Sequence, residues 1–324
     1  MTSARCPIRR WRRRRVHSSR VQLIKSHGSK NEIFAAAARP AQFPSGSALR
    51  AFVRRICDRR AWTGGADGVY FFDVGTPRAQ AWFFNPDGSA AEFCGNGMRG
   101  LGRLVLDLRG TETEVIRSGD RDYTVRRGPS TPEGVRQVLL EMPPVSFGAV
   151  PPPPFAGFTA VTVPNPHVVA IVDKYVESDL IAAGERANSG RPLFPVGANV
   201  SFLLPLGSDE VFVRTFERGA GLTPSCGSGA VASRAVYSRV TGADPGRRLV
   251  VRNAGGVAAA VIDIRNGRWF PTLEGNATFV YRAETDFAGG RVTPPEFAED
   301  EIAAYAALDA ENREHLAAAG VETA

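Results

Sequence analysis

The spacing of hydrophobic residues predicts short strands interrupted by a few amphipathic helices. Apolar runs bounded by turn residues indicate strands, whereas apolar residues three or four positions apart indicate one face of a helix. In the first half we expect strands near residues 21–25, 69–74, 79–85, 114–117, 123–126 and 136–142, a polar loop over 27–32, and helices over 47–59 and from the Cys94–Gly97 turn to Gly110.

The second half repeats this order after a proline cluster. The cluster runs from Pro143 to Pro154 and breaks regular structure, so we expect it to link two domains. Beyond it we expect strands near residues 158–163, 168–172, 199–205 and 210–217, helices over 179–187 and 230–240, further strands to about residue 282 and an Ala/Glu-rich helix at the end.

Two copies of one short motif indicate an internal repeat. The C-G-N-G of Cys94–Gly97 and the C-G-S-G of Cys226–Gly229 each follow a strand and open a helix. Gene duplication into two similar α/β lobes is the simplest account. We expect a first lobe over residues 21–145, a second over 146–270, a strand over 271–284 that returns to the first lobe, and an appended helical tail over 285–324.

Composition is that of a soluble globular protein with a nearly neutral body. Hydrophobic residues make up 43% of the chain, and no apolar run approaches the roughly 18 residues that cross a bilayer. Residues 1–20 hold eight of the 40 basic residues and no acid, which leaves 32 basic against 33 acidic side chains elsewhere. We expect residues 1–20 to be a disordered extension; a transit peptide and a nucleic-acid-binding arm are the alternatives.

The four cysteines form neither a disulfide scaffold nor a zinc motif. Cys6, Cys57, Cys94 and Cys226 are scattered and include no C-x-x-C pair. Free thiols in a reducing cytoplasm, without a bound metal, are the simplest expectation.

The paired motif suits the inversion of a carbon stereocentre. Inversion requires one group to remove a proton from one face and another to return a proton to the opposite face. A thiol at a helix N-terminus suits both roles, because exposed N–H groups and the helix dipole favour the thiolate. The same N–H groups can bind a carboxylate on which negative charge develops. A cysteine before a glycine turn is also often only a small buried residue, so spacing alone leaves both readings open.

Further motifs resemble those of the diaminopimelate epimerase family. They follow the family's order over residues 21–283 and comprise His27-Gly28 with Asn31, Ala66–Gly68, Phe84–Ser89, Asn165–His167, Asn199-Val200 and Glu217–Gly221, besides the two cysteine motifs. The resemblance implies two pseudo-symmetric α/β lobes, each a mixed or antiparallel sheet wrapped around a central helix. It also implies a homodimer that interconverts LL- and meso-diaminopimelate, a small-molecule substrate, by a two-base mechanism without a cofactor.

The resemblance assigns roles to individual residues. Cys94 and Cys226 match the catalytic pair, and Glu217 matches the acid that meets the distal ammonium group of the substrate. His167 is expected to support the site and Asp67 to shape a turn. The other matched substrate contacts are the side chains of Asn31, Asn85, Asn165, Asn199 and Arg218 and the backbone N–H groups of Gly95, Asn96, Gly227 and Ser228.

The sequence departs from the family pattern beside the expected site. Lys30 and Pro164 stand where glycine is usual, Glu32 replaces an aspartate and Leu222 replaces a glutamate. These changes leave open a relative with the same chemistry on another amino acid. A third possibility is a non-catalytic binding protein whose Arg-rich tail contacts nucleic acid, although the near-neutral body and the paired thiols weigh against it.

Overall fold

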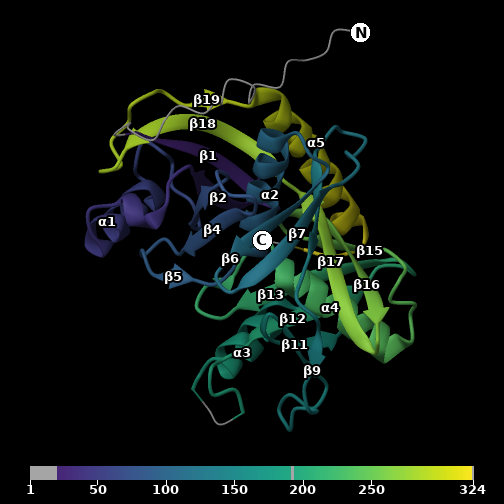
Figure 1. Cartoon of the computed structure of the whole chain (residues 1–324). Coiled ribbons are helices and arrows are strands. Elements are labelled where there is room, and N and C mark those ends of the chain that lie inside the picture. The colour runs from purple at the N-terminus through teal and green to yellow at the C-terminus, as the bar shows by residue number, and fades with distance from the viewer. Residues whose placement is uncertain (1–19, 191–192, 323–324) are drawn as a thin grey trace.

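A computed structural model describes residues 20–190 and 193–322 and shows a mixed α/β protein whose strands join in one continuous sheet (Figure 1). The expected extension over residues 1–20 therefore lies outside the described residues, apart from Arg20, which begins the first strand. No helix within the described residues has the length and apolar character needed to cross a membrane.

The elements fall into two matching sets. The first set is β1 (Arg20–Gly28), β2 (Asn31–Ala36), α1 (Gly46–Cys57), β3 (Val69–Asp73), β4 (Ala79–Phe84), β5 (Ala90–Ala91), α2 (Gly95–Arg109), β6 (Thr113–Ser118), β7 (Arg121–Arg127) and β8 (Gln137–Glu141). The second set is β10 (Thr159–Val163), β11 (Asn165–Ile171), α3 (Glu177–Ala187), β12 (Asn199–Pro205), β13 (Glu210–Glu217), β14 (Gly221–Leu222), α4 (Gly227–Thr241), β15 (Leu249–Asn253), β16 (Gly256–Arg265) and β17 (Arg268–Asn276).

Strand pairing repeats step by step between the two sets. In the first, β1 is antiparallel to β2, β2 parallel to β3, β3 antiparallel to β4, β4 parallel to β6, and β6, β7 and β8 follow antiparallel. The second set shows the same succession of antiparallel and parallel pairings, along β10, β11, β12, β13, β15, β16 and β17. The pseudo-symmetric two-lobed fold predicted from the repeated motif is confirmed.

Each lobe is built around one buried helix. Residues 96–106 of α2 and 229–238 of α4 are buried along almost the whole of their length. Both helices end at a glycine in the left-handed conformation, Gly110 and Gly242, as expected for C-caps. Burial on every side explains why the first turn of each helix, which carries the cysteine motif, has a fixed position relative to the surrounding strands.

Further pairings tie the lobes together. Strand β8 lies antiparallel to β17, and β18 (Thr278–Asp286) returns to pair with β1 in the first lobe. The chain then forms β19 (Glu296–Phe297) and the long helix α5 (Glu299–Ala318), which runs from β18 toward β15 and β16 (Figure 1). The lobes therefore share both a sheet and a C-terminal helix.

Three details differ from the sequence-based expectations. The polar segment over 27–32 is mostly strand, with only Ser29 and Lys30 forming the turn between β1 and β2. The following strand escaped prediction because residues 33–36 are all buried and show no alternation of polar and apolar positions. The proline cluster is also not wholly irregular, because β9 (Ser146–Phe147) lies inside it and pairs with β10.

Candidate active site

Both expected cysteines occupy the N-cap position of a central helix. The Cys94 Sγ accepts the N–H of Gly97 at 3.5 Å, and the Cys226 Sγ accepts the N–H of Gly229 at 3.3 Å. Their backbone torsions are nearly the same, with φ/ψ of −134°/112° at Cys94 and −123°/111° at Cys226. The repeat thus presents two half-buried thiols in matching local geometry.

The two cysteine turns meet where the lobes join. The buried Asn96 side chain donates from Nδ2 to the carbonyl of Ser225 at 3.3 Å and to its hydroxyl at 3.2 Å. A Cβ added at Gly227 would lie 3.2 Å from Asn96 Oδ1 and 3.0 Å from Leu273 Cδ2, so a larger residue would require these side chains to shift. A residue close to Cys94 in the first lobe is therefore in direct contact with the residue that precedes Cys226 in the second lobe.

Each thiol faces a polar acceptor. The Cys226 Sγ–H donates to Glu217 Oε2 at 3.2 Å, and the Thr223 hydroxyl donates to the other carboxylate oxygen. The Cys94 Sγ–H donates to Asn31 Oδ1 over a longer distance of 3.6 Å. Two of the predicted substrate contacts, Glu217 and Asn31, thus lie directly beside the two sulfurs.

Burial dominates the protonation of the pair. It raises the pKa of Cys94 to about 11, although the Gly97 N–H acts in the opposite direction. The pKa of Cys226 is raised well above its usual value by burial and, next, by the Glu217 carboxylate. Burial also raises the pKa of Glu217 itself. The N–H groups at the helix N-termini favour the thiolates, as expected, but desolvation of the charged sulfur outweighs them.

A second group of predicted residues surrounds the motif of the second lobe. His167 Nε2 lies 3.1 Å from the Ser228 hydroxyl and 3.3 Å from Asn199 Nδ2. Asn199 Oδ1 in turn accepts the backbone N–H of Arg218 at 2.8 Å. Burial lowers the pKa of His167 to about 3, so the imidazole is neutral. Its contacts suit the supporting role expected for it.

Two predicted contacts are less closely tied to the sulfurs. The Asn85 side chain donates from Nδ2 to the Ser89 hydroxyl at 3.0 Å, within its own turn. Asn165 is the first residue of β11 and pairs with Val163 of β10, two positions before His167. Asn165 therefore shares a strand with the supporting histidine, whereas Asn85 belongs to the β4–β5 turn of the other lobe.

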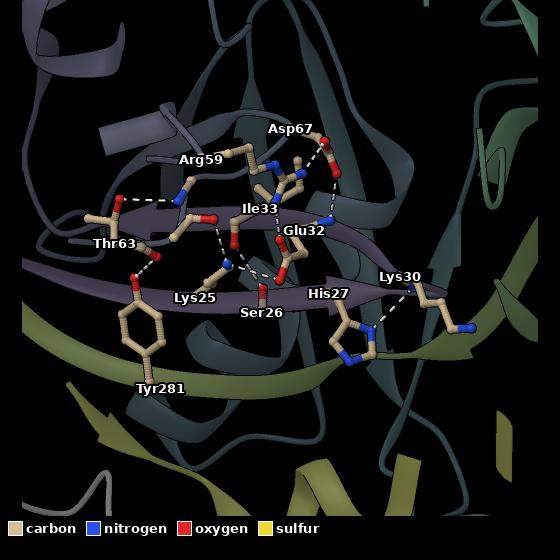
Figure 2. Close-up of polar contacts among 12 residues, drawn as sticks. Lys25, Ser26, His27, Lys30, Glu32, Ile33, Arg59, Thr63, Asp67 and Tyr281 are labelled. Atoms are coloured by element: carbon tan, nitrogen blue, oxygen red, sulfur yellow. Dashed lines mark hydrogen bonds and ion pairs between the residues drawn. The ribbon is translucent and has the colours of Figure 1, made fainter. Parts of the chain in front are cut away.

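Three departures from the family pattern have partners away from the sulfurs. The Lys30 ammonium group lies 2.7 Å from Asp309 Oδ1 of α5, and Glu32 forms an ion pair with Lys25 at 2.9 Å. Figure 2 shows the Lys30 side chain pointing outward from the turn, on the opposite side from the Glu32 network. Leu222 packs against the apolar core of the second lobe. The Lys30 ammonium group and the Leu222 side chain therefore have partners other than the two sulfurs.

Several residues of the site had escaped sequence analysis. Ser225 bridges the lobes, as its hydroxyl donates to the Ser29 carbonyl at 2.9 Å. Arg99 is only 1% exposed and donates from Nε to the Asn276 carbonyl at 3.2 Å. A charged residue among the apolar positions of the first-lobe helix was the one local signal for Arg99. Within residues 20–190 and 193–322, no three His, Cys, Asp or Glu side chains are grouped so that they could hold a metal ion.

Comparison with known proteins agrees with this geometry. The family described as diaminopimelate epimerase matches residues 159–280. A diaminopimelate epimerase of Enterococcus faecalis is 33% identical over 302 residues, which cover 83% of this chain and 91% of that protein. The chain belongs to the diaminopimelate epimerase family. The epimerase of Clostridium acetobutylicum is 30% identical over 281 residues, covering 81% and 84% of the two chains. As a member of the diaminopimelate epimerase family, the protein is an isomerase.

Solved structures share the two-lobed fold. A protein from Pseudomonas aeruginosa described as a predicted epimerase superimposes with a TM-score of 0.61 at 16% identity, covering 82% of this chain and 99% of that one. A hydroxyproline epimerase from Agrobacterium vitis gives a TM-score of 0.59 at 15% identity, with 84% and 94% covered. At this identity the likeness establishes the fold of this diaminopimelate epimerase family member. The substrate has to be inferred from the residues of the site.

Proposed function

We propose that the protein interconverts LL- and meso-diaminopimelate without a cofactor, with Cys94 and Cys226 as the paired acid and base. The observation that carries the proposal is that two cysteine turns of matching geometry meet where the lobes join, with each sulfur beside a polar acceptor. The similar proteins from Enterococcus and Clostridium, both named diaminopimelate epimerase, support this choice of substrate.

The proton transfers follow from two thiols on opposite lobes. One sulfur, as thiolate, removes the α-proton and becomes a thiol, while the other thiol gives its proton to the opposite face and becomes a thiolate. The inverted product leaves with the roles of the two sulfurs exchanged. Glu217 accepts the hydrogen bond of the Cys226 thiol and is placed to take its proton. While it is charged, the Glu217 carboxylate adds to the burial that keeps the sulfur neutral, so the Cys226 thiolate forms only as its proton moves to Glu217.

The helix N-termini supply the electrostatic part of the mechanism. The N–H groups of Gly95 and Asn96 begin α2, and those of Gly227 and Ser228 begin α4. Donors at these positions suit the reacting carboxylate, because removal of the α-proton spreads negative charge onto its oxygens. We assign the reacting carboxylate to these N–H groups.

The distal end of the substrate is assigned to residues of the second lobe and to Asn85 of the first. Arg218 can bind a carboxylate in bidentate fashion and Glu217 can bind an ammonium group. Asn199 fixes the Arg218 backbone at 2.8 Å, and Asn165 and Asn85 complete the proposed set. Because Lys30 and Leu222 are engaged elsewhere, they give no reason to exclude a substrate with two charged ends.

Proton exchange tests the assignment directly. Purified protein incubated with LL-diaminopimelate in deuterated water should incorporate deuterium at the α-carbon and form the meso isomer. Cys94→Ala and Cys226→Ala should each lose turnover by at least about a hundredfold. Cys57→Ala is the matched control, because Cys57 is buried in the apolar core beside α1 and has no proposed role.

The outcomes separate the competing functions. Exchange with a different amino acid, together with none on diaminopimelate, would assign the same chemistry to another substrate. Full turnover in either Cys94→Ala or Cys226→Ala would refute the two-base mechanism. The homodimer implied by the family stays a prediction, which light scattering of the purified protein can check.

A further inference from the structure

Helix α5 connects the two lobes through polar contacts at both ends. Near its start, Glu301 forms an ion pair with Arg103 of α2 at 2.5 Å. Toward its end, Asn312 Nδ2 donates to the Asn253 carbonyl of β15 at 3.0 Å, and His315 lies 2.9 Å from Glu210 of β13. The helix, yellow in Figure 1, therefore contacts the first lobe with one end and the second lobe with the other.

The middle of α5 packs against the turn between β1 and β2. The Asp309 side chain is only 8% exposed, and its Oδ1 lies 2.7 Å from the Lys30 ammonium group. The Tyr305 ring packs edge-on against His27 with centroids 4.3 Å apart, and its hydroxyl donates to the Gly255 carbonyl. A buried carboxylate that meets a lysine from a separate segment fixes the position of that segment.

The same turn contacts the surroundings of both catalytic thiols. The Ser29 carbonyl accepts the hydroxyl of Ser225, the residue before Cys226, at 2.9 Å. Asn31, the residue after Lys30, accepts the Cys94 Sγ–H at 3.6 Å. A displacement of this turn therefore reaches both lobes.

The turn adopts a backbone conformation that its residues disfavour. Ser29 and Lys30 have φ of 50° and 65°, in the left-handed region, which is unfavourable for residues other than glycine unless tertiary contacts hold them. A glycine at position 30 would adopt this conformation without strain but would lack the side chain that reaches Asp309. Lysine at this position therefore has an unfavourable backbone conformation, but its side chain forms an ion pair with Asp309 of α5.

We propose that α5 is a positioning element of the active site, in which Asp309 acts through Lys30 to hold the β1–β2 turn against the two cysteine motifs. The inference rests on the proposed function of Cys94 and Cys226. It assigns Asp309 no contact with substrate. The role of Asp309 is to keep the β1–β2 turn in the position from which Asn31 contacts the Cys94 sulfur and Ser29 contacts Ser225, the residue before Cys226.

Substitutions at both ends of the ion pair test the proposal. Asp309→Asn and Lys30→Gly should each lower kcat by about three- to tenfold with KM nearly unchanged, because the thiols rather than the substrate contacts lose support. The double variant should be no slower than the slower single variant, since both changes remove one interaction. Arg313→Gln is the matched control: Arg313 lies 3.0 Å from the other Asp309 oxygen, but its side chain is 61% exposed, and its loss should leave kcat unchanged.

Thiol reactivity provides a readout that does not depend on the substrate. The alkylation rate of Cys94 by iodoacetamide should differ from wild type in Asp309→Asn and Lys30→Gly and should match wild type in Arg313→Gln. Wild-type kcat and alkylation in both test variants would overturn the proposal, as would a lowered melting temperature with unchanged kcat. If the wild-type protein fails to epimerise diaminopimelate while the alkylation rates still shift, the substrate assignment fails and the positioning role stands.

Discussion

The clearest test of the electrostatic account concerns the protonation of Cys94. Burial raises the pKa of this thiol from an ordinary value of 9.0 to about 11. At any pH below about 9, the thiolate population should therefore be about a hundredfold smaller than in an exposed thiol, because each pKa unit is a factor of ten. The thiolate is the species that reacts with alkylating reagents, so its population can be read from a rate.

The assay is alkylation of the protein by iodoacetamide at a series of pH values without substrate. The modified Cys94 peptide is quantified by mass spectrometry at each time point. Its rate should rise about tenfold for each pH unit from about pH 7 to about pH 10, without a plateau. The same protein unfolded in urea provides the control, because its exposed thiols should level off above about pH 9.

A plateau in the Cys94 rate below about pH 9 would refute the reasoning. It would mean that the α2 N-terminus and the Gly97 N–H outweigh the loss of solvent around the sulfur. The resting site would then contain a preformed thiolate, and Glu217 would not be needed to generate one at Cys226.

Three further results are expected. Glu217→Gln should speed the alkylation of Cys226, because the carboxylate raises the pKa of that thiol, while epimerase turnover falls at least about tenfold; an unchanged alkylation rate would argue against this influence. The free energy of unfolding, measured with urea at several pH values, should decrease as the pH falls below about 6.5. The reason is that the pKa of His167 is held at about 3 in the folded protein, so the unfolded chain takes up the proton first. A free energy of unfolding that stays constant from about pH 6.5 to 4 would contradict this expectation. Gly184→Ala should destabilise the protein by roughly 1–3 kcal/mol, since a Cβ there would overlap a phenylalanine ring of β13. Gly157→Ala is the control, because open space surrounds this glycine and its thermal midpoint should stay close to that of the wild type. A Gly184→Ala midpoint equal to that of Gly157→Ala would show that the phenylalanine ring of β13 can move aside.

Local features of the chain were predictable from the sequence. Strands β12 and β13 have the bounds expected for them, Asn199–Pro205 and Glu210–Glu217, because short apolar runs end there at turn-forming segments. The two cysteine motifs were correctly placed at helix N-termini, since Gly-rich turns before an apolar helical repeat are local signals. The order of elements in the two halves, and hence the two-lobed fold, followed from the same kind of pattern.

The surroundings of the site depended on contacts between distant segments. Ser225 meets Asn96 from 129 positions away, and Lys30 meets Asp309 of a helix that looked merely appended. No periodicity along the chain records such pairs, because it reports which face of an element is buried and not which element covers that face. The positive φ at Ser29 and Lys30 was hidden for the same reason, as distant contacts hold the turn.

The sequence by itself therefore determined the two cysteines, their place before two helices and the repeated order of elements around them. Tertiary structure alone decided how acidic those thiols are, because their pKa depends on how completely packing removes water from the sulfur and on the carboxylate that packing brings near. Burial and neighbouring charge are properties of the assembled lobes, and here they outweigh the N–H groups of the helix N-termini, which act in the opposite direction.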